Sequence, residues 1–150
     1  MLGVIGGWIV GILTPTIQRA IDKWFALRDD RVALLTYVAR DVLPSLRTMD
    51  EQLEAYLRSG APEGWSISEA LYLGMAMPDA PVHRILPKDQ RERYLGPFKT
   101  LHEQIVTFNR EHGFHHDEKA RKAAKRARRS IDALLGRAET DLPEPPEDIA

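Results

Sequence analysis

Residues 1–18 contain no charged side chain, and this feature constrains the chain more than any other. The strongly apolar part runs from Leu2 to Leu13. A helix over residues 1–18 reaches about 27 Å, close to the roughly 30 Å hydrocarbon core of a bilayer. Arg19 follows directly and can extend its side chain to the headgroups, and the bilayer can thin to absorb the shortfall. The segment therefore predicts an N-terminal membrane-anchor helix.

Three glycines, Gly3, Gly7 and Gly11, recur at four-residue intervals and line one face of this helix. Small residues at this spacing let two helix backbones pack closely in lipid. In water the same glycines make a poor helix, so the pattern favours a membrane. Two alternatives stay open: a segment lying at the interface or buried in a soluble oligomer, and a signal peptide, which would lack the usual basic start.

Basic residues flank the apolar segment on one side only, since Arg19, Lys23, Arg28 and Arg31 all follow it. Lysine and arginine near the end of a spanning helix favour the cytoplasm. We therefore expect a single-pass protein with its N-terminus outside and its body cytoplasmic. The absence of cysteine agrees with a reducing compartment and excludes a disulfide scaffold.

The body of the chain has helical periodicity. One apolar stripe alternates by four and three residues, as in a heptad seam, through Leu35, Ala39, Val42, Leu46, Met49, Leu53 and Tyr56. The seam predicts either self-association or a core within one molecule. We expect Pro44 to kink or divide this helix, with Ser45 capping the second part and Gly60 ending it.

Further helices are predicted along the rest of the body. A capping box at residues 66–69 predicts a short helix over 67–76, and prolines make 78–87 a loop. Another helix starts at Pro87, bends or splits at Gly96–Pro97 and is capped by Gly113. The last helix covers about 116–138. No alternating pattern indicates a strand, so the fold is expected to be all-α: an anchor at 1–18, a helical bundle or coiled-coil-like hairpin at 19–138 and a disordered acidic tail at 139–150.

The last helix is strongly basic. Its positive side chains are Lys119, Arg121, Lys122, Lys125, Arg126, Arg128 and Arg129. Such a face binds anionic lipid headgroups, an acidic protein or nucleic-acid phosphates, or is simply solvated. No aromatic residue lies between Lys119 and Arg137, which disfavours base stacking. The whole chain has a net charge of −1, so any attraction for polyanions is local to this helix.

The turn before this helix gathers His112, His115 and His116, next to Asp117 and Glu118. Imidazole and carboxylate groups this close can bind zinc. Gly113 interrupts the helix, however, and breaks the spacing that would bring them to one face. We therefore expect a polar turn, with no metal and no cofactor.

Arg110 and His115 form an R-x-x-x-x-H pattern. This pattern resembles the active-site motif of the HEPN ribonucleases, which are helical dimers that pair an arginine and a histidine from each subunit. The resemblance implies that Arg110 and His115 would act on a scissile phosphate through charge and acid–base chemistry. It covers only these six residues.

Taken together, these features predict a small membrane-anchored interaction or scaffold protein without catalytic residues, which associates with itself or with a partner helix. One alternative is a membrane-permeabilising oligomer of the lysis or toxin kind, built from the glycine-faced helices. The second alternative is the ribonuclease.

Overall fold

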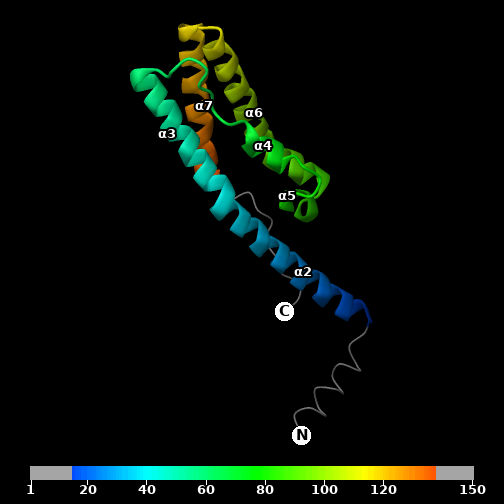
Figure 1. Ribbon diagram of the computed structural model, residues 1–150. Helices are drawn as coiled ribbons and strands as arrows, with labels where there is room; N and C mark the ends of the chain where they lie inside the picture. The colour runs from blue at the N-terminus through cyan, green and yellow to red at the C-terminus, as the bar shows by residue number, and fades with distance from the viewer. Residues whose placement is uncertain (1–14, 138–150) are drawn as a thin grey trace.

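The computed structural model describes residues 15–137, and this part of the chain is all-α with no strand. Seven elements follow one another along the chain (Figure 1). They are α2 (Pro15–Tyr37), the π-turn η1 (Val38–Val42), α3 (Leu43–Ser59), α4 (Ala70–Met75), α5 (Pro81–Ile85), α6 (Lys88–Gly113) and α7 (Asp117–Arg137). The predicted all-α class is confirmed for these residues.

The longest feature is a rod made of α2, η1 and α3, which run on without a break from Pro15 to Ser59 (Figure 1). The α3 half packs against α7, and α6 and α7 pair as an antiparallel hairpin. The α2 half projects beyond this three-helix bundle and packs against the short α5, while α4 lies on α6. The bundle thus sits at one end of the rod.

The core lies between α3, α6 and α7. Its largest fully buried side chains on these helices are Leu46, Leu53, Phe98, Leu101, Ile105, Phe108 and Ile131. Burying each such side chain contributes roughly 1.5–3 kcal/mol relative to leaving it in water. Because α7 presents mainly alanine to the core, its backbone approaches α3 and α6 closely.

The predicted seam is correct from Val42 onward but wrong before it. Ala39 is exposed and Leu35 only half-buried, whereas Leu34 and Val38 are fully buried. The buried positions therefore step by four up to Leu46, which in an α-helix would rotate the face by about 120°. The π-turn takes up one extra residue, because Leu43 donates its N–H to the carbonyl of Val38, and so keeps the face aligned.

Pro44 does not divide the helix, because the π-turn comes directly before it. Proline has no N–H and its ring clashes with the carbonyl four residues earlier. The wider turn over Val38–Val42 accommodates this, so α3 continues from η1 with Pro44 in its first turn. Ser45 is not a cap: α3 follows from Val42, and no side chain caps it. Gly60 does end α3, with a φ of 73°.

The predicted capping box at residues 66–69 is wrong, and α4 begins only at Ala70. The reason is a competing partner. Asn109 on α6 accepts the N–H of Ile67 at 2.9 Å and donates to the Ile67 carbonyl at 2.8 Å and to Glu69 at 3.0 Å. These bonds hold Ile67 against α6 and engage the Glu69 carboxylate, so Glu69 is unavailable to Ser66. Ser68 instead accepts the N–H of Ala70.

Helix α6 is unbroken through Gly96–Pro97, contrary to the predicted bend or split. Glycine before proline removes the Cβ that would clash with the proline ring, so the helical conformation is retained. The helix ends at Gly113 as predicted, but the left-handed residue of the turn is His115, with a φ of 59°. The predicted loop at 78–87 also contains the short helix α5.

Candidate functional site

The basic helix α7 is oriented by its alanines. Its buried side chains are Ala120, Ala123, Ala124, Ala127, Ile131 and Leu134, and they form one face against the bundle. In a helix the residues between these positions point away from the core. The basic side chains are therefore turned toward solvent or toward the edge of the interface with α3.

Two of the seven basic residues bind α3. The Arg128 Nε donates to Asp50 Oδ1 at 2.9 Å, and its Nη2 lies 3.9 Å from Glu54 Oε2. The hydrogen bond to Asp50 raises the pKa of the Arg128 guanidinium above its usual range, although partial burial opposes this. Arg121 donates to the carbonyl of Leu57 at 3.1 Å, in the last turn of α3. These contacts fix α7 against α3.

The other five residues form what we call the basic face. It consists of Lys119, Lys122, Lys125, Arg126 and Arg129, and all five are exposed. Lys122 pairs with Glu118, one turn earlier on the same helix, at 3.1 Å. Within residues 15–137, Lys125, Arg126 and Arg129 make no ion pair. The basic face is thus a positive stripe in which, among the described residues, only Lys122 has an ion-pair partner.

The seam residues lie inside the bundle. Val42, Leu46, Met49, Leu53 and Tyr56 are all buried, and Leu35 packs against the core with its side chain half-buried. They therefore favour the intramolecular alternative for this seam. Self-association through it would require α6 and α7 to be displaced.

His112 is a core residue. Its ring stacks on Phe108, with the centroids 5.9 Å apart, and meets Tyr56 and Trp65 edge-on. Its Nε2 lies 3.3 Å from the carbonyl of Pro62, and this hydrogen bond ties the loop after α3 to α6. The His112 ring therefore has a structural role in the core.

The two other histidines of the cluster each have their own carboxylate. His116 Nδ1 is 2.7 Å from Glu111 Oε2, and His115 Nε2 is 3.6 Å from Glu63. In residues 15–137, no group of three histidine or acidic side chains is arranged to hold a metal ion. The cluster is a polar turn in this part of the chain.

Arg110 and His115, the pair that resembles the HEPN motif, are both exposed. Arg110 Nη2 donates to Glu111 Oε1 at 3.3 Å, while His115 turns to Glu63 on the loop after α3. Each cation thus has its own acidic neighbour. The ribonuclease alternative gains no support from this geometry.

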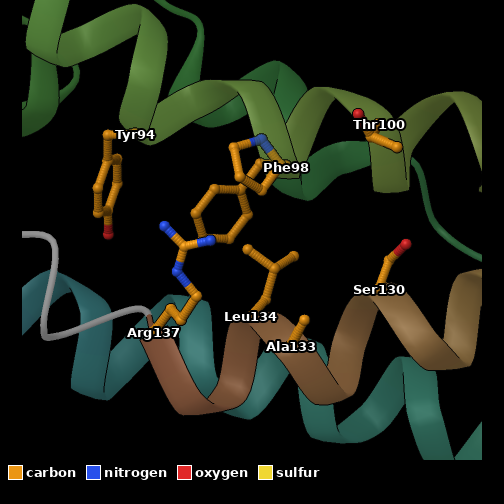
Figure 2. Close-up of a pocket in the computed structure, with 8 residues that line it drawn as sticks. Tyr94, Phe98, Thr100, Ser130, Ala133, Leu134 and Arg137 are labelled. Carbon is orange, nitrogen blue, oxygen red and sulfur yellow. The ribbon is translucent and has the colours of Figure 1, made fainter.

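A cavity of about 160 Å³ lies between α6 and α7 near the end of α7 (Figure 2). Phe98 and Leu134 line it, and Figure 2 shows Arg137 extending from α7 toward Tyr94 and Phe98 on α6. Small-molecule sites usually enclose about 300–1,000 Å³, so this cavity is small for one.

The glycines Gly3, Gly7 and Gly11 lie outside the described residues, as does the acidic tail. Within residues 15–137, none of the helices combines the length and the apolar character that a bilayer crossing requires. The predicted anchor thus stays a prediction.

Two contacts that build the bundle were not predicted from the sequence. Arg128 and Asp50 lie far apart in the chain, as do Asn109 and Ile67. Local spacing carries no signal for such pairs, because they depend on how helices pack. No protein-family model, curated protein or solved structure matches the chain.

Proposed function

We propose that this chain is a small, non-enzymatic interaction protein that residues 1–18 tether to a membrane, with the body on the cytoplasmic side. In this proposal the basic face of α7 binds an acidic surface on a partner protein. The observation that carries the proposal is the rigid presentation of that face: Arg121 and Arg128 secure α7 to α3, and five further cations stay exposed. A positive stripe held in one geometry supplies both attraction and register for an anionic partner.

If the rod stands upright on the membrane, it favours a protein partner over the tethering membrane. Arg128 binds α3 at Asp50 and Arg121 binds it at Leu57, so the basic face lies beside the distal part of the rod. At 1.5 Å per residue, Arg19 and Asp50 are about 45 Å apart along the axis. That distance exceeds the screening length of about 8 Å at physiological salt several times over. With the rod upright, the face is beyond the attraction of the headgroups.

The tether is tested by fractionation. The full chain and a chain starting at Thr16 are expressed, and the membranes are washed with alkaline carbonate. We expect the full chain to stay in the membrane fraction and the shortened chain to be soluble. Should both be soluble, the tether is wrong, and residues 1–18 belong in an assembly interface.

The basic face is tested with a glutamate-rich peptide, whose binding is followed by fluorescence anisotropy. We expect binding that weakens with salt and is lost in the double variant Lys125→Glu/Arg129→Glu. The matched control is Arg40→Glu/Arg47→Glu, because both residues are exposed cations on the rod outside the basic face. Equal binding by both variants, or a preference for RNA of the same charge, would contradict the proposed partner class.

A further inference from the structure

We propose that a groove between α4, α5 and α6 binds a phosphate monoester. This groove has a volume of about 570 Å³ and lies apart from the basic face of α7. The residues that carry the argument are Tyr72 on α4, His83 on α5, and Lys88, Arg91, Leu95 and Lys99 on α6. This site is independent of the partner surface proposed above.

The centre of the groove is a contact between two cation-forming side chains. The Nη1 of Arg91 lies 2.9 Å from the Nδ1 of His83. A guanidinium has only donors, so it must donate here, and the imidazole Nδ1 must accept. The remaining imidazole proton then sits on Nε2. This arrangement turns His83 into a second donor beside the arginine.

Both residues keep a buried donor unsatisfied. The Nε2 of His83 and the Nε of Arg91 are buried and have no hydrogen-bond partner within residues 15–137. Leaving a buried donor unpaired costs about 1–3 kcal/mol, and more when the group is charged. Both unpaired donors belong to residues that line the groove, so a modest rotation of either side chain would offer its donor to an acceptor bound there.

Two lysines add positive charge at the same groove. Lys88 and Lys99 are exposed and lie on the side of α6 that also carries Leu95. Glu92 lines the groove as well, so the charged groups of this site sum to two positive charges with His83 neutral. A phosphate monoester carries nearly two negative charges at neutral pH and offers three acceptor oxygens. It therefore matches both the charge and the donors.

The groove is large enough for an organic phosphate ester, so we expect such an ester to be the ligand and not inorganic phosphate. Its volume falls in the range of small-molecule sites, which usually enclose about 300–1,000 Å³. Tyr72 and Leu95 supply apolar wall next to the cations. A ligand with a phosphate at one end and an apolar or aromatic part at the other fits this division.

The test uses the full chain in a neutral detergent, with phenyl phosphate and inorganic phosphate as probes and binding followed by calorimetry. We expect phenyl phosphate to bind more tightly than inorganic phosphate. Arg91→Lys keeps the charge but removes the Nε donor and the planar fork, so we expect it to weaken binding about 10- to 100-fold. Glu92→Gln removes the opposing charge and is expected to strengthen binding.

One further site variant and one control keep the result interpretable. Lys88→Ala/Lys99→Ala changes only exposed side chains, so it weakens binding without disturbing the fold. Lys125→Ala/Arg129→Ala removes the same charge from the basic face of α7 and is expected to leave phosphate binding unchanged. Binding that falls equally in both double variants would mean a general charge effect and overturn the site.

A vesicle-binding experiment distinguishes a soluble phosphate ester from a lipid headgroup as the ligand. Phosphatidylcholine vesicles with and without phosphatidic acid are compared, using the parent and Arg91→Lys. Binding to phenyl phosphate in solution assigns a soluble ester. Dependence on phosphatidic acid that is lost in Arg91→Lys, with no binding of phenyl phosphate, assigns a lipid headgroup. If the parent binds neither probe, the proposal is wrong.

Discussion

Glu111 makes several of the hydrogen bonds in the turn between α6 and α7. Its carboxylate accepts from His116 at 2.7 Å and from Arg110 at 3.3 Å, and its carbonyl accepts the N–H of His116 at 2.9 Å. These contacts, led by the His116 hydrogen bond, hold the pKa of the Glu111 carboxyl below its usual 4.5. A carboxylate with a lowered pKa stabilises the folded state above its unfolded pKa and loses that contribution as the pH falls.

Glu111→Gln should therefore change how stability depends on pH. At pH 7 the parent is expected to melt at a higher temperature than the variant, and the gap should begin to shrink near pH 4.5 and close as the pH falls through the lower, folded-state pKa of Glu111. Melting followed by circular dichroism from pH 7 to pH 3.5 measures this. Glu103→Gln is the matched control, because Glu103 is an exposed carboxylate on the same helix with no ion pair within residues 15–137. A gap that persisted at acid pH would contradict the role of the charge.

At the scale of elements, the π-turn is the device that joins two differently phased helices. Buried Leu34, Val38, Val42 and Leu46 follow four-residue steps, and the later buried positions alternate by three and four. Removing one exposed residue from the turn would convert the whole series into a strict heptad pattern. The residue inserted in the π-turn is therefore not needed to align the buried face. Its role is to widen the turn so that it accommodates Pro44.

Deleting Arg40 in a Pro44→Ala background tests this interpretation. We expect the deletion variant to fold and to melt within a few degrees of Pro44→Ala alone, because the buried face stays aligned. Deleting Glu51, also exposed but inside α3, is the control. It rotates Leu53 and Tyr56 by about 100° out of the core and should abolish cooperative melting. Equal damage from both deletions would show that the π-turn itself is required.

Pro97 is the second irregular position, since it lies inside α6 without breaking it. Pro97→Ala restores one helical N–H and is expected to stabilise the fold by about 1–3 kcal/mol, as alanine is favoured over proline in helix interiors. Urea unfolding measures the change. Pro87 precedes the first turn of α6, where no helical hydrogen bond is missing, so Pro87→Ala should give no gain. A loss of stability in Pro97→Ala would mean that packing of the ring outweighs the missing bond.

Comparison of these elements with the sequence shows where periodicity suffices. The apolar spacing identified α6, α7 and the seam after Val42, and Gly60 marked the end of α3. It failed at the π-turn, because Leu35 and Ala39 continue the heptad spacing before Val42 just as Leu34 and Val38 continue the four-residue steps. It also failed at Glu69, where Asn109 on another helix binds the side chain that a local cap would use.

Of the candidate sites, the basic face of α7 was predictable from the sequence of one helix. The His83–Arg91 contact was not, since it depends on how α5 folds back onto α6.

For the whole molecule, the arrangement of rod and bundle decides what the basic face can reach. The bundle occupies the α3 end of the rod, and the α2 end leads back to residues 1–14 (Figure 1). If residues 1–18 are the tether, an upright rod places the basic face far from the bilayer, whereas a rod lying flat brings it to the headgroups. The proposed protein partner requires the first orientation.

Site-specific labelling distinguishes the two orientations, and the lack of native cysteine makes it direct. A fluorophore is attached to Asp22→Cys, near the start of the rod, or to Lys125→Cys on the basic face; both positions are exposed. The labelled proteins are inserted into vesicles that contain a headgroup-attached nitroxide, which quenches only at short range. We expect strong quenching at position 22 and little at position 125. Equal quenching would mean that the rod lies flat, so that the basic face binds lipid instead of protein. If neither label were quenched, residues 1–18 would not insert, and the tether would fail together with the orientation derived from it.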